Sequence, residues 1–288
     1  MERFETGAQW RLALDDARSE GKTIGFVPTM GALHEGHRSL VARARRSCDV
    51  VAVSIFVNPL QFGDLSDLER YPRPVHHDEA LLSAAGCDVL FMPSVDEMYP
   101  DIKRPSISHE GVGVLGDLFE GVDRPGHFDG VATVVALLFE LTGPCKAFFG
   151  NKDFQQLAVV RRMVDALGLP VDIVACPTIR DEGGLALSSR NARLSSEGRR
   201  HATAFHRALL AGAACFEQGG TPSQVDDAMK QEADAEPALA LAYAVVVEAA
   251  SFLRPALFEE AVEYRLLIAG EVEGVRLIDN AAVDGSDR

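Results

Sequence analysis

The alternation of short apolar runs with segments of helical periodicity is the feature that most constrains the fold of this chain. Five runs rich in β-branched or aromatic residues occur before residue 178, and four helical segments lie between them. Parallel strands joined by helical crossovers have this rhythm. The sequence therefore predicts an α/β fold, a Rossmann-like doubly wound parallel sheet over residues 1–178. The expected strands are 23–27, 49–57, 88–92, 146–150 and 171–176, and the expected helices are 77–86, 130–143, 153–168 and one that starts at His37.

The pattern changes after residue 178. Two helical segments, 195–218 and 222–234, follow one another without an intervening strand. Three apolar runs then read as strands, at 239–249, 262–272 and 275–280. The sequence predicts a smaller C-terminal α+β domain over residues 179–288, joined through the loop "PTIRDEGGLALSSRN".

The charge excludes one class of partner. The 288 residues carry 28 Lys and Arg against 43 Asp and Glu, a net charge of −15, and both halves are acidic. A nucleic-acid groove is not expected on such a chain, and an anionic ligand must be held by a few placed cations, backbone N–H groups or a metal.

No apolar stretch reaches the roughly 18 residues of a membrane helix, and "MERFETGAQW" lacks the layout of a signal peptide. We expect a cytoplasmic protein without a membrane partner. The five cysteines are scattered, with no CxxC pair, so we interpret them as small apolar residues in a reducing compartment.

The stretch "PTMGALHEGH", residues 28–37, follows the first strand at a strand-to-helix corner. Ligands of open parallel sheets bind outside the carboxyl ends of strands, and a helix N-terminus favours anions. Gly31 and Gly36 allow a close backbone approach, and His34 and His37 can bind phosphate oxygens. A helix cap, a transition-metal pair or a plain tight turn are the alternatives that this stretch alone leaves open.

The corner resembles the HxGH signature of nucleotidyltransferases and class I tRNA synthetases, in which both histidines contact ATP phosphates. "LALSSRN", residues 185–191, stands where that superfamily has a mobile KMSKS-like loop. Longer motifs resemble one family within it, the pantoate–β-alanine ligases (pantothenate synthetases). These motifs are "PTMGALHEGH", "SIFVNPLQFG", "DLERYPR", "MYP", "RPGHFDGVATVV", "FFGNKDFQQLAVVRRMV" and "GLALSSRNARLS".

The resemblance implies a two-step reaction with ATP as co-substrate and Mg²⁺. Pantoate attacks the α-phosphorus to give pantoyl adenylate and pyrophosphate, and β-alanine then displaces AMP to form pantothenate. It implies catalytic roles for His34, His37 and Lys152, with His37 as proton donor. The remaining roles that the resemblance implies are pantoate binding by Met30, Gln61 and Gln156, β-alanine binding by Gln61, and ATP binding by Met30, Gly31, Ala32, Leu33, His34, Glu35, Gly36, His37, Gly150, Asn151, Lys152, Asp153, Ile179, Leu187, Ser188, Ser189 and Arg190.

The residue types fit these roles. Gln61 and Gln156 offer paired donors and acceptors for a hydroxy acid. Ser188 and Arg190 can donate to phosphate oxygens, and we predict a loop that closes over ATP. Asp153 also stands where it can cap the helix that follows, and both of its roles can hold at once.

Three positions depart from the family pattern: Asn151 and Gly183 each replace an acid, and His77 stands beside Asp78 in place of an acidic pair. The protein ligands of Mg²⁺ are therefore unknown, with Asp78 as the one candidate; the metal is expected to arrive on ATP.

Two other functions compete. A nucleotidyltransferase acting on a phosphorylated acceptor would need additional cations. A non-catalytic nucleotide-binding module would not need both the HxGH corner and the "LALSSRN" segment. The ligase needs neutral polar contacts such as Gln61 and Gln156. By resemblance we expect a homodimer built from the first domain.

Overall fold

The computed structural model describes residues 1–63, 65–100 and 113–285. The chain divides into two compact units. The N-terminal unit comprises Met1–Gly150 and Gln155–Cys176, and the C-terminal unit comprises Asn151–Phe154 and Pro177–Arg288. No described helix is both long and apolar enough to cross a membrane.

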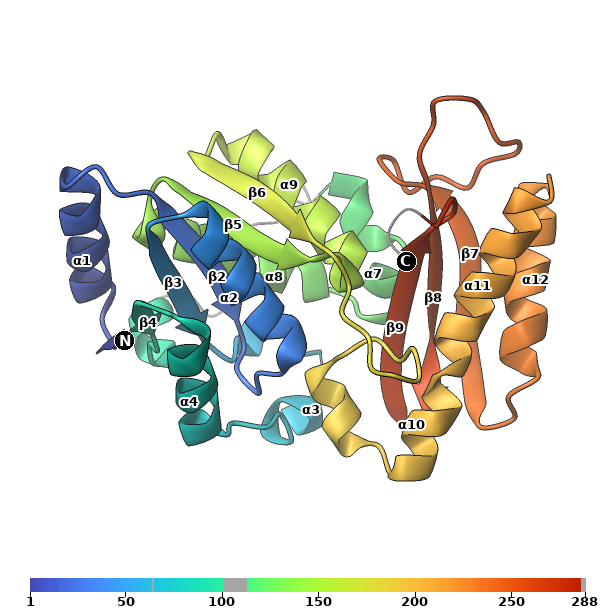
Figure 1. Ribbon diagram of the computed structural model, residues 1–288, viewed down its shortest axis with the longest axis horizontal. Helices are drawn as coiled ribbons and strands as arrows, with labels where there is room; N and C mark the ends of the chain where they lie inside the picture. Colours follow the sequence, from blue (N-terminus) through green and yellow to red (C-terminus); the bar gives the residue numbers. More distant parts are fainter. Residues whose placement is uncertain (64, 101–112, 286–288) are drawn as a thin grey trace. The chain divides into compact units, whose positions relative to one another are not determined.

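The N-terminal unit is built on a parallel sheet with the order β1-β4-β3-β2-β5-β6 (Figure 1). The doubly wound parallel fold predicted from the sequence is confirmed. Its strands are β1 (Glu2–Phe4), β2 (Ile24–Thr29), β3 (Val50–Ile55), β4 (Val89–Phe91), β5 (Cys145–Gly150) and β6 (Val171–Cys176).

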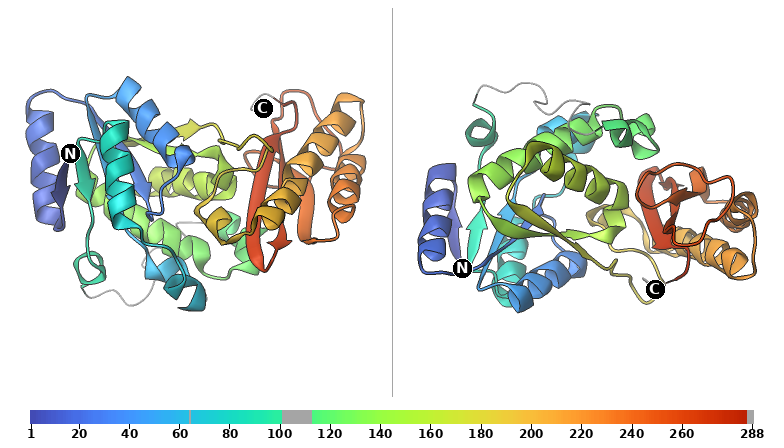
Figure 2. Two further views of the ribbon diagram at one scale, coloured as in Figure 1. Left: turned by 60° about the horizontal axis from the view of Figure 1, so that its bottom comes forward. Right: turned by 90° about the horizontal axis from the view of Figure 1, so that it is seen from above.

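Helices cover both faces of this sheet. Helices α2 and α4 pack together on one face, whereas α8 and α9 lie on the other (Figure 2). The chain moves one way from β2 to β3 and the other way from β5 to β6, so the switch point lies between β2 and β5. The helices are α1 (Gly7–Ser19), α2 (Glu35–Ser47), α3 (Leu65–Glu69), α4 (Val75–Ala85), α5 (Val95–Met98), α7 (Glu120–Asp123), α8 (His127–Thr142) and α9 (Phe154–Leu167), with 3₁₀ helices η1 (Pro59–Gln61) and η2 (Gly113–Asp117).

Strand β1 and helix α1 were not predicted. Strand β1 has three residues and pairs only with β4 at the sheet edge, so it is too short to show an alternation of apolar and polar residues. Helix α1 buries mainly Trp10 and Leu14, and its other positions are largely polar. Trp10 nevertheless anchors the helix, because its indole stacks on Phe91 at 5.2 Å and donates to the Thr142 hydroxyl at 3.2 Å.

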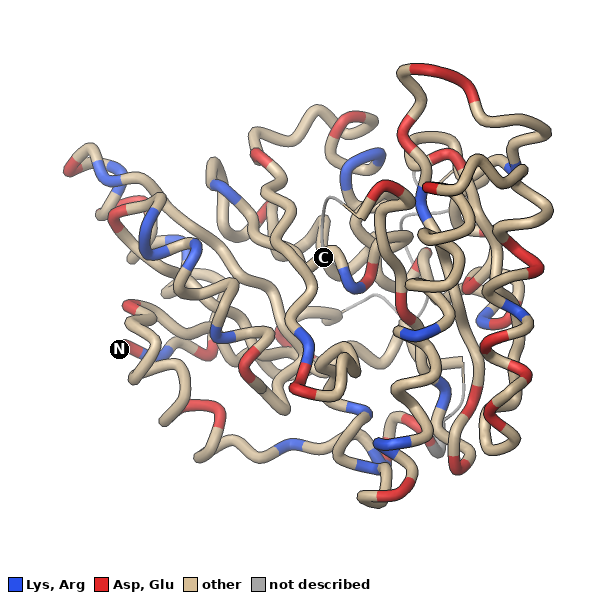
Figure 3. Tube along the Cα trace, turned by 45° about the vertical axis from the view of Figure 1, so that its right-hand side comes forward, with Lys and Arg blue, Asp and Glu red and all other residues tan. Residues whose placement is uncertain are grey.

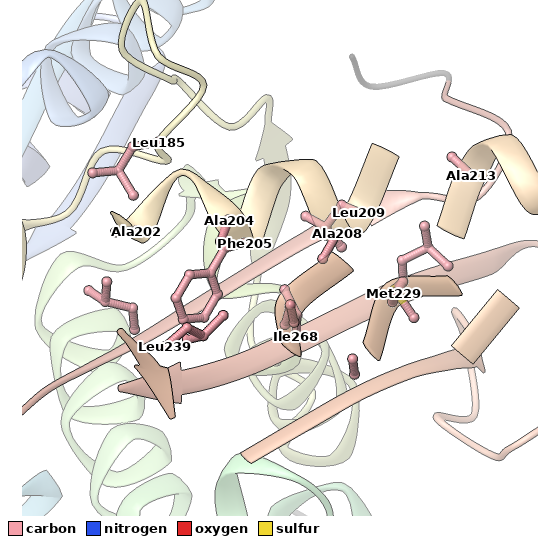
Figure 4. Packing of buried hydrophobic residues seen from close by; sticks show 14 of the residues in the cluster. Leu185, Ala202, Ala204, Phe205, Ala208, Leu209, Ala213, Met229, Leu239 and Ile268 are labelled. Carbon is pink, nitrogen blue, oxygen red and sulfur yellow. The ribbon is translucent and has the colours of Figure 1, made fainter. Parts of the chain in front are cut away.

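The three strands expected in the C-terminal unit are present, and the structure shows that they form an antiparallel sheet of order β7-β8-β9. Its core is formed by helices packed on that sheet, and Figure 4 shows Phe205, Leu209, Met229 and Ile268 within it. The elements are η3 (Asn151–Asp153), η4 (Ser189–Arg193), α10 (Ser196–Ala202), α11 (Ala204–Glu217), α12 (Pro222–Asp234), β7 (Leu239–Glu248), β8 (Tyr264–Val272) and β9 (Val275–Ala282).

The helical segment expected over 195–218 divides into α10 and α11 at Thr203. The Thr203 N–H and hydroxyl both donate to the Arg200 carbonyl, at 3.3 and 2.7 Å. A hydroxyl that bonds locally competes with the helical hydrogen-bond pattern, and here the first helix ends.

All five cysteines are free thiols, and three of them, Cys48, Cys87 and Cys176, are buried. Burial raises the pKa of Cys87 and of Cys145 to about 12. Thiols protonated at neutral pH are poor nucleophiles, which agrees with their interpretation as packing residues.

Acidic and basic side chains are interspersed along both units (Figure 3). Several are paired at the surface, such as Arg45 with Asp88 at 2.5 Å and Arg207 with Glu232 at 2.8 Å.

Candidate functional site

The corner 28–37 joins β2 to α2 at the switch point of the sheet. Helix α2 begins at Glu35 and not at His37, because His34 is its N-cap. The His34 imidazole accepts from the Gly36 N–H at 3.2 Å, and the His37 imidazole accepts from the His34 N–H at 3.4 Å. The two histidines thus form a reciprocal capping box, a role usually filled by Ser or Thr with Glu.

The same two hydrogen bonds determine which ring nitrogens can donate. In both His34 and His37 the acceptor is Nδ1, so the proton of each neutral ring is on Nε2. The ring centroids lie 4.2 Å apart with a 52° angle between the planes. The corner therefore holds two adjacent Nε2–H donors at a helix N-terminus, an arrangement suited to binding phosphate oxygens.

Asp78 of α4 fixes the backbone of this corner. Its carboxylate accepts from the N–H groups of Ala32 and Leu33, both at 2.8 Å, and its side chain is almost wholly buried. Gly31 and Ala32 have positive φ angles of +80° and +50°. A left-handed alanine costs roughly 1–2 kcal/mol, which the two charge-assisted hydrogen bonds offset.

These contacts favour a scaffold role for Asp78 over its candidate role as a metal ligand, because both of its oxygens already accept backbone N–H groups. His77 is largely exposed, with Nδ1 3.5 Å from Asp78 Oδ1. The described residues contain no group of three His, Cys, Asp or Glu side chains that could hold a metal ion.

We expect Asp78→Asn to lower the free energy of unfolding by about 2 kcal/mol, because one backbone N–H would face an amide NH₂. The rate of the adenylation step that the resemblance implies should fall about tenfold as the corner loosens. Denaturant unfolding and initial rates at two Mg²⁺ concentrations measure both effects, with His77→Ala as the control. Recovery of the Asp78→Asn rate at high Mg²⁺ would instead support metal ligation.

Gln61 lies in η1, the first element after β3, and contacts the corner. Its amide donates to Met30 Sδ at 3.0 Å and accepts from Asn58 Nδ2 at 3.0 Å. Asn58 also accepts from the Tyr99 hydroxyl at 2.8 Å. Burial raises the pKa of Tyr99 far above its usual range, so this hydroxyl remains a donor. The structure thus brings together Met30 and Gln61, both expected to bind pantoate.

The backbone of Gln61 is held from α8. The His127 ring Nδ1 lies 2.9 Å from the Gln61 carbonyl oxygen, and its Nε2 lies 3.0 Å from Arg124. Gly130 leaves room for η1, because a Cβ there would lie 2.3 Å from the Leu60 carbonyl oxygen. These residues stand within the motifs that carry the resemblance. Their contacts with η1 join positions about 70 residues apart, so no local sequence pattern predicts them.

Lys152 lies in η3, two residues after β5 ends at Gly150. Its ammonium is 3.2 Å from Asp153 Oδ1, and its side chain is 18% exposed. Asp153 directly precedes Phe154, the first residue of α9. The remaining predicted pantoate residue, Gln156, lies half-buried in the first turn of that helix.

The segment around "SSRN" starts from a small hairpin. Leu187 donates its N–H to the Ile179 carbonyl at 2.9 Å, and Arg180 forms a bridge with Ala186. Ser188 caps η4 by accepting from the Arg190 N–H at 3.3 Å. Of the residues predicted to bind ATP in this segment, Ile179 and Leu187 therefore pair in the hairpin. Ser188, Ser189 and Arg190 lie in the turn that follows it.

The predicted site residues fall into two groups, one in each unit. The corner residues, Gln61 and Gln156 belong to the N-terminal unit, whereas Asn151, Lys152, Asp153 and the "SSRN" residues belong to the C-terminal unit. Asn151 is one of the three departures from the family pattern. Its backbone carbonyl accepts a hydrogen bond from Asn280 Nδ2, and this contact does not depend on the Asn151 side chain.

A doubly wound parallel sheet with an HxGH corner at its switch point defines a class of enzymes that act on nucleotides. Comparison with known families narrows the class: the profile of the pantoate–β-alanine ligases matches residues 2–282. The chain belongs to this family.

Relatives and solved structures agree. The chain is 50% identical over 276 residues to the pantothenate synthetase of Paracoccus denitrificans, with 96% of each chain covered. A crystal structure of pantothenate synthetase from Thermus thermophilus superposes with a TM-score of 0.90 at 47% identity, covering 98% of this chain and 99% of that one. A ligase from Francisella tularensis, complexed with β,γ-ATP and β-alanine, gives a TM-score of 0.80 at 32% identity, covering 100% of both chains. The family predicted from the motifs is confirmed.

Proposed function

We propose that this enzyme condenses (R)-pantoate with β-alanine to form pantothenate, using ATP and releasing AMP and pyrophosphate. The observation that carries the assignment is the histidine corner of a family member, with two Nε2–H donors at a helix N-terminus. The Francisella relative, complexed with β,γ-ATP and β-alanine, supports two of these substrates, ATP and β-alanine.

In the first step a pantoate carboxylate oxygen bonds to the α-phosphorus, and the bond from that phosphorus to the bridging oxygen of pyrophosphate breaks. Negative charge develops on the leaving group, where His34, His37 and Lys152 would donate hydrogen bonds. Met30, Gln61 and Gln156 would hold pantoate in line for the attack.

In the second step the neutral amine of β-alanine attacks the carbonyl carbon of pantoyl adenylate, the C–O bond to AMP breaks, and the nitrogen releases one proton to solvent as the amide forms. Gln61 would orient both the acyl group and β-alanine, since its amide has a donor and an acceptor side. Exclusion of water matters here because the mixed anhydride hydrolyses. Ser188, Ser189 and Arg190 would close over the nucleotide for this reason.

ATP would be bound by the corner residues 30–37, the turn 150–153, and Ile179, Leu187 and the "SSRN" residues. We also propose that residues 1–178 bind ATP and pantoate while residues 179–288 act as the lid domain. Mg²⁺ would arrive bound to the phosphates of ATP and retain several waters. The enzyme would work as a cytoplasmic homodimer.

Isotope exchange between pyrophosphate and ATP tests this function. Pantoate alone should support exchange, and pantothenate should form only when β-alanine is added. Exchange that requires a phosphorylated acceptor instead of pantoate would identify a nucleotidyltransferase. The absence of any exchange, with ATP still bound, would indicate a non-catalytic module.

A further inference from the structure

Two adjacent residues of the last strand, Asp279 and Asn280 in β9, are almost completely buried, at 4% and 3% exposure. Each contacts a different segment that the proposed function assigns to ATP, and all of these contacts lie within the C-terminal unit.

Both ends of the Asn280 amide make hydrogen bonds, one end to the turn that carries Lys152 and the other to Arg265. The Nδ2 group donates to the carbonyls of Asn151, at 3.0 Å, and Lys152, at 2.7 Å. The Oδ1 atom accepts from Arg265 Nε at 2.8 Å. Two carbonyls on one side and a guanidinium on the other determine the orientation of the amide. In the opposite orientation Oδ1 would lie against the two carbonyl oxygens, and Nδ2 would lie against the guanidinium N–H.

Arg265 extends this support to the residue that follows the turn. Its guanidinium lies over the Phe154 ring, 4.5 Å from the centroid, and Phe154 packs against Phe252 at 5.5 Å. Asn280 and Arg265 therefore hold the turn on both sides of Asp153. The backbone that carries Lys152 is therefore fixed by Arg265 of β8 and Asn280 of β9.

Asp279 holds the other segment. Its carboxylate pairs with Arg180 at 2.5 and 3.0 Å, a bidentate ion pair with the Asp279 side chain only 3% exposed. Arg180 also donates to the Gly184 carbonyl at 3.1 Å and bridges with Ala186. The hairpin that leads into Ser188 is thereby fixed to β9.

We propose that Asn280 is a positioning residue for Lys152, and that Asp279 and Asn280 together hold the Lys152 turn and the "SSRN" hairpin on one strand. This inference rests on the proposed function. Because neighbouring residues of a strand cannot move independently, the two segments keep a fixed spacing within the C-terminal unit. The backbone from which the Lys152 side chain extends toward the leaving pyrophosphate is thus set in place before ATP binds.

The test is a double-mutant cycle on pantoate-dependent pyrophosphate–ATP exchange with Asn280→Asp, Lys152→Ala and the double variant. The aspartate keeps the size of the side chain and the acceptor for Arg265, but places an oxygen against the two carbonyls. Asp226→Asn is the matched control: Asp226 is 2% exposed in the same unit, and its hydrogen-bond partners are the Val246 N–H and Arg254, not residues of η3.

We expect Asn280→Asp to lower kcat for exchange about tenfold or more, with the KM for pantoate unchanged. In the Lys152→Ala background the same change should have less than about a twofold effect, because a residue that acts through Lys152 is not additive with it. Asp226→Asn should keep the wild-type kcat at temperatures below its Tm.

Wild-type kcat in Asn280→Asp, an equal loss in both backgrounds, or an equal loss in Asp226→Asn would each overturn the inference. If Asn280→Asp does not fold, Asn280→Ser, which removes the amide without adding charge, replaces it in the cycle with the same expected results. Failure of the proposed function is distinguishable, because the wild type would then show no pantoate-dependent exchange at all.

Discussion

Replacing His37 with alanine should reduce pantoate-dependent pyrophosphate–ATP exchange by about 10²–10³-fold, the usual cost of removing one preorganised donor to a developing negative charge. The Nε2–H of His37 is oriented by the hydrogen bond from the His34 N–H to Nδ1, so this donor requires no reorganisation during the reaction. Steady-state rates of exchange and of pantothenate formation measure the effect.

The same substitution removes half of the capping box of α2, which should cost only about 1 kcal/mol of stability. A thermal unfolding curve separates this small loss from the large loss of activity. His76→Ala is the control, since His76 lies on α4 with a fully exposed side chain. Exchange in His37→Ala within a few fold of the wild type would contradict the role of the corner.

Gly130→Ala should reduce kcat/KM for pantoate by about 10²-fold, the expected cost of displacing a substrate contact by about 1 Å. The new Cβ would lie 2.3 Å from the Leu60 carbonyl oxygen and 2.7 Å from the Gln61 N atom. These are backbone atoms of η1, so the turn itself must move and carry the Gln61 amide away from Met30. Overpacking should also cost about 1–3 kcal/mol of stability.

Initial rates at varied pantoate and at varied ATP distinguish this effect from general damage, because the KM for ATP should change much less. Gly63→Ala is the matched control: it lies two residues after Gln61, and a Cβ there has nothing within 4 Å. A Gly130→Ala enzyme with the wild-type KM for pantoate would show that Gln61 does not hold this substrate.

Asp78 is a position at which the sequence alone does not assign one role. The acid next to His77 invited a metal role, since carboxylates bind Mg²⁺ and the family pattern has an acidic pair there. The structure places the Asp78 carboxylate on two N–H groups of the corner. A carboxylate that holds a left-handed alanine and one that binds a cation are the same residue type, so only the contacts distinguish them.

The sequence by itself determined the parallel sheet, the three strands of the C-terminal unit, the corner after β2 and the family. Each of these is recorded locally, in β-branched runs, glycines at a corner and motifs of up to 17 consecutive residues. It did not determine the edge strand β1, the division at Thr203, or the partners of Asp78, Gly130 and Asn280. Apart from the division at Thr203, which follows a local hydrogen bond, these features depend on atoms from segments as much as 129 positions apart, and such contacts exist only once the chain has folded.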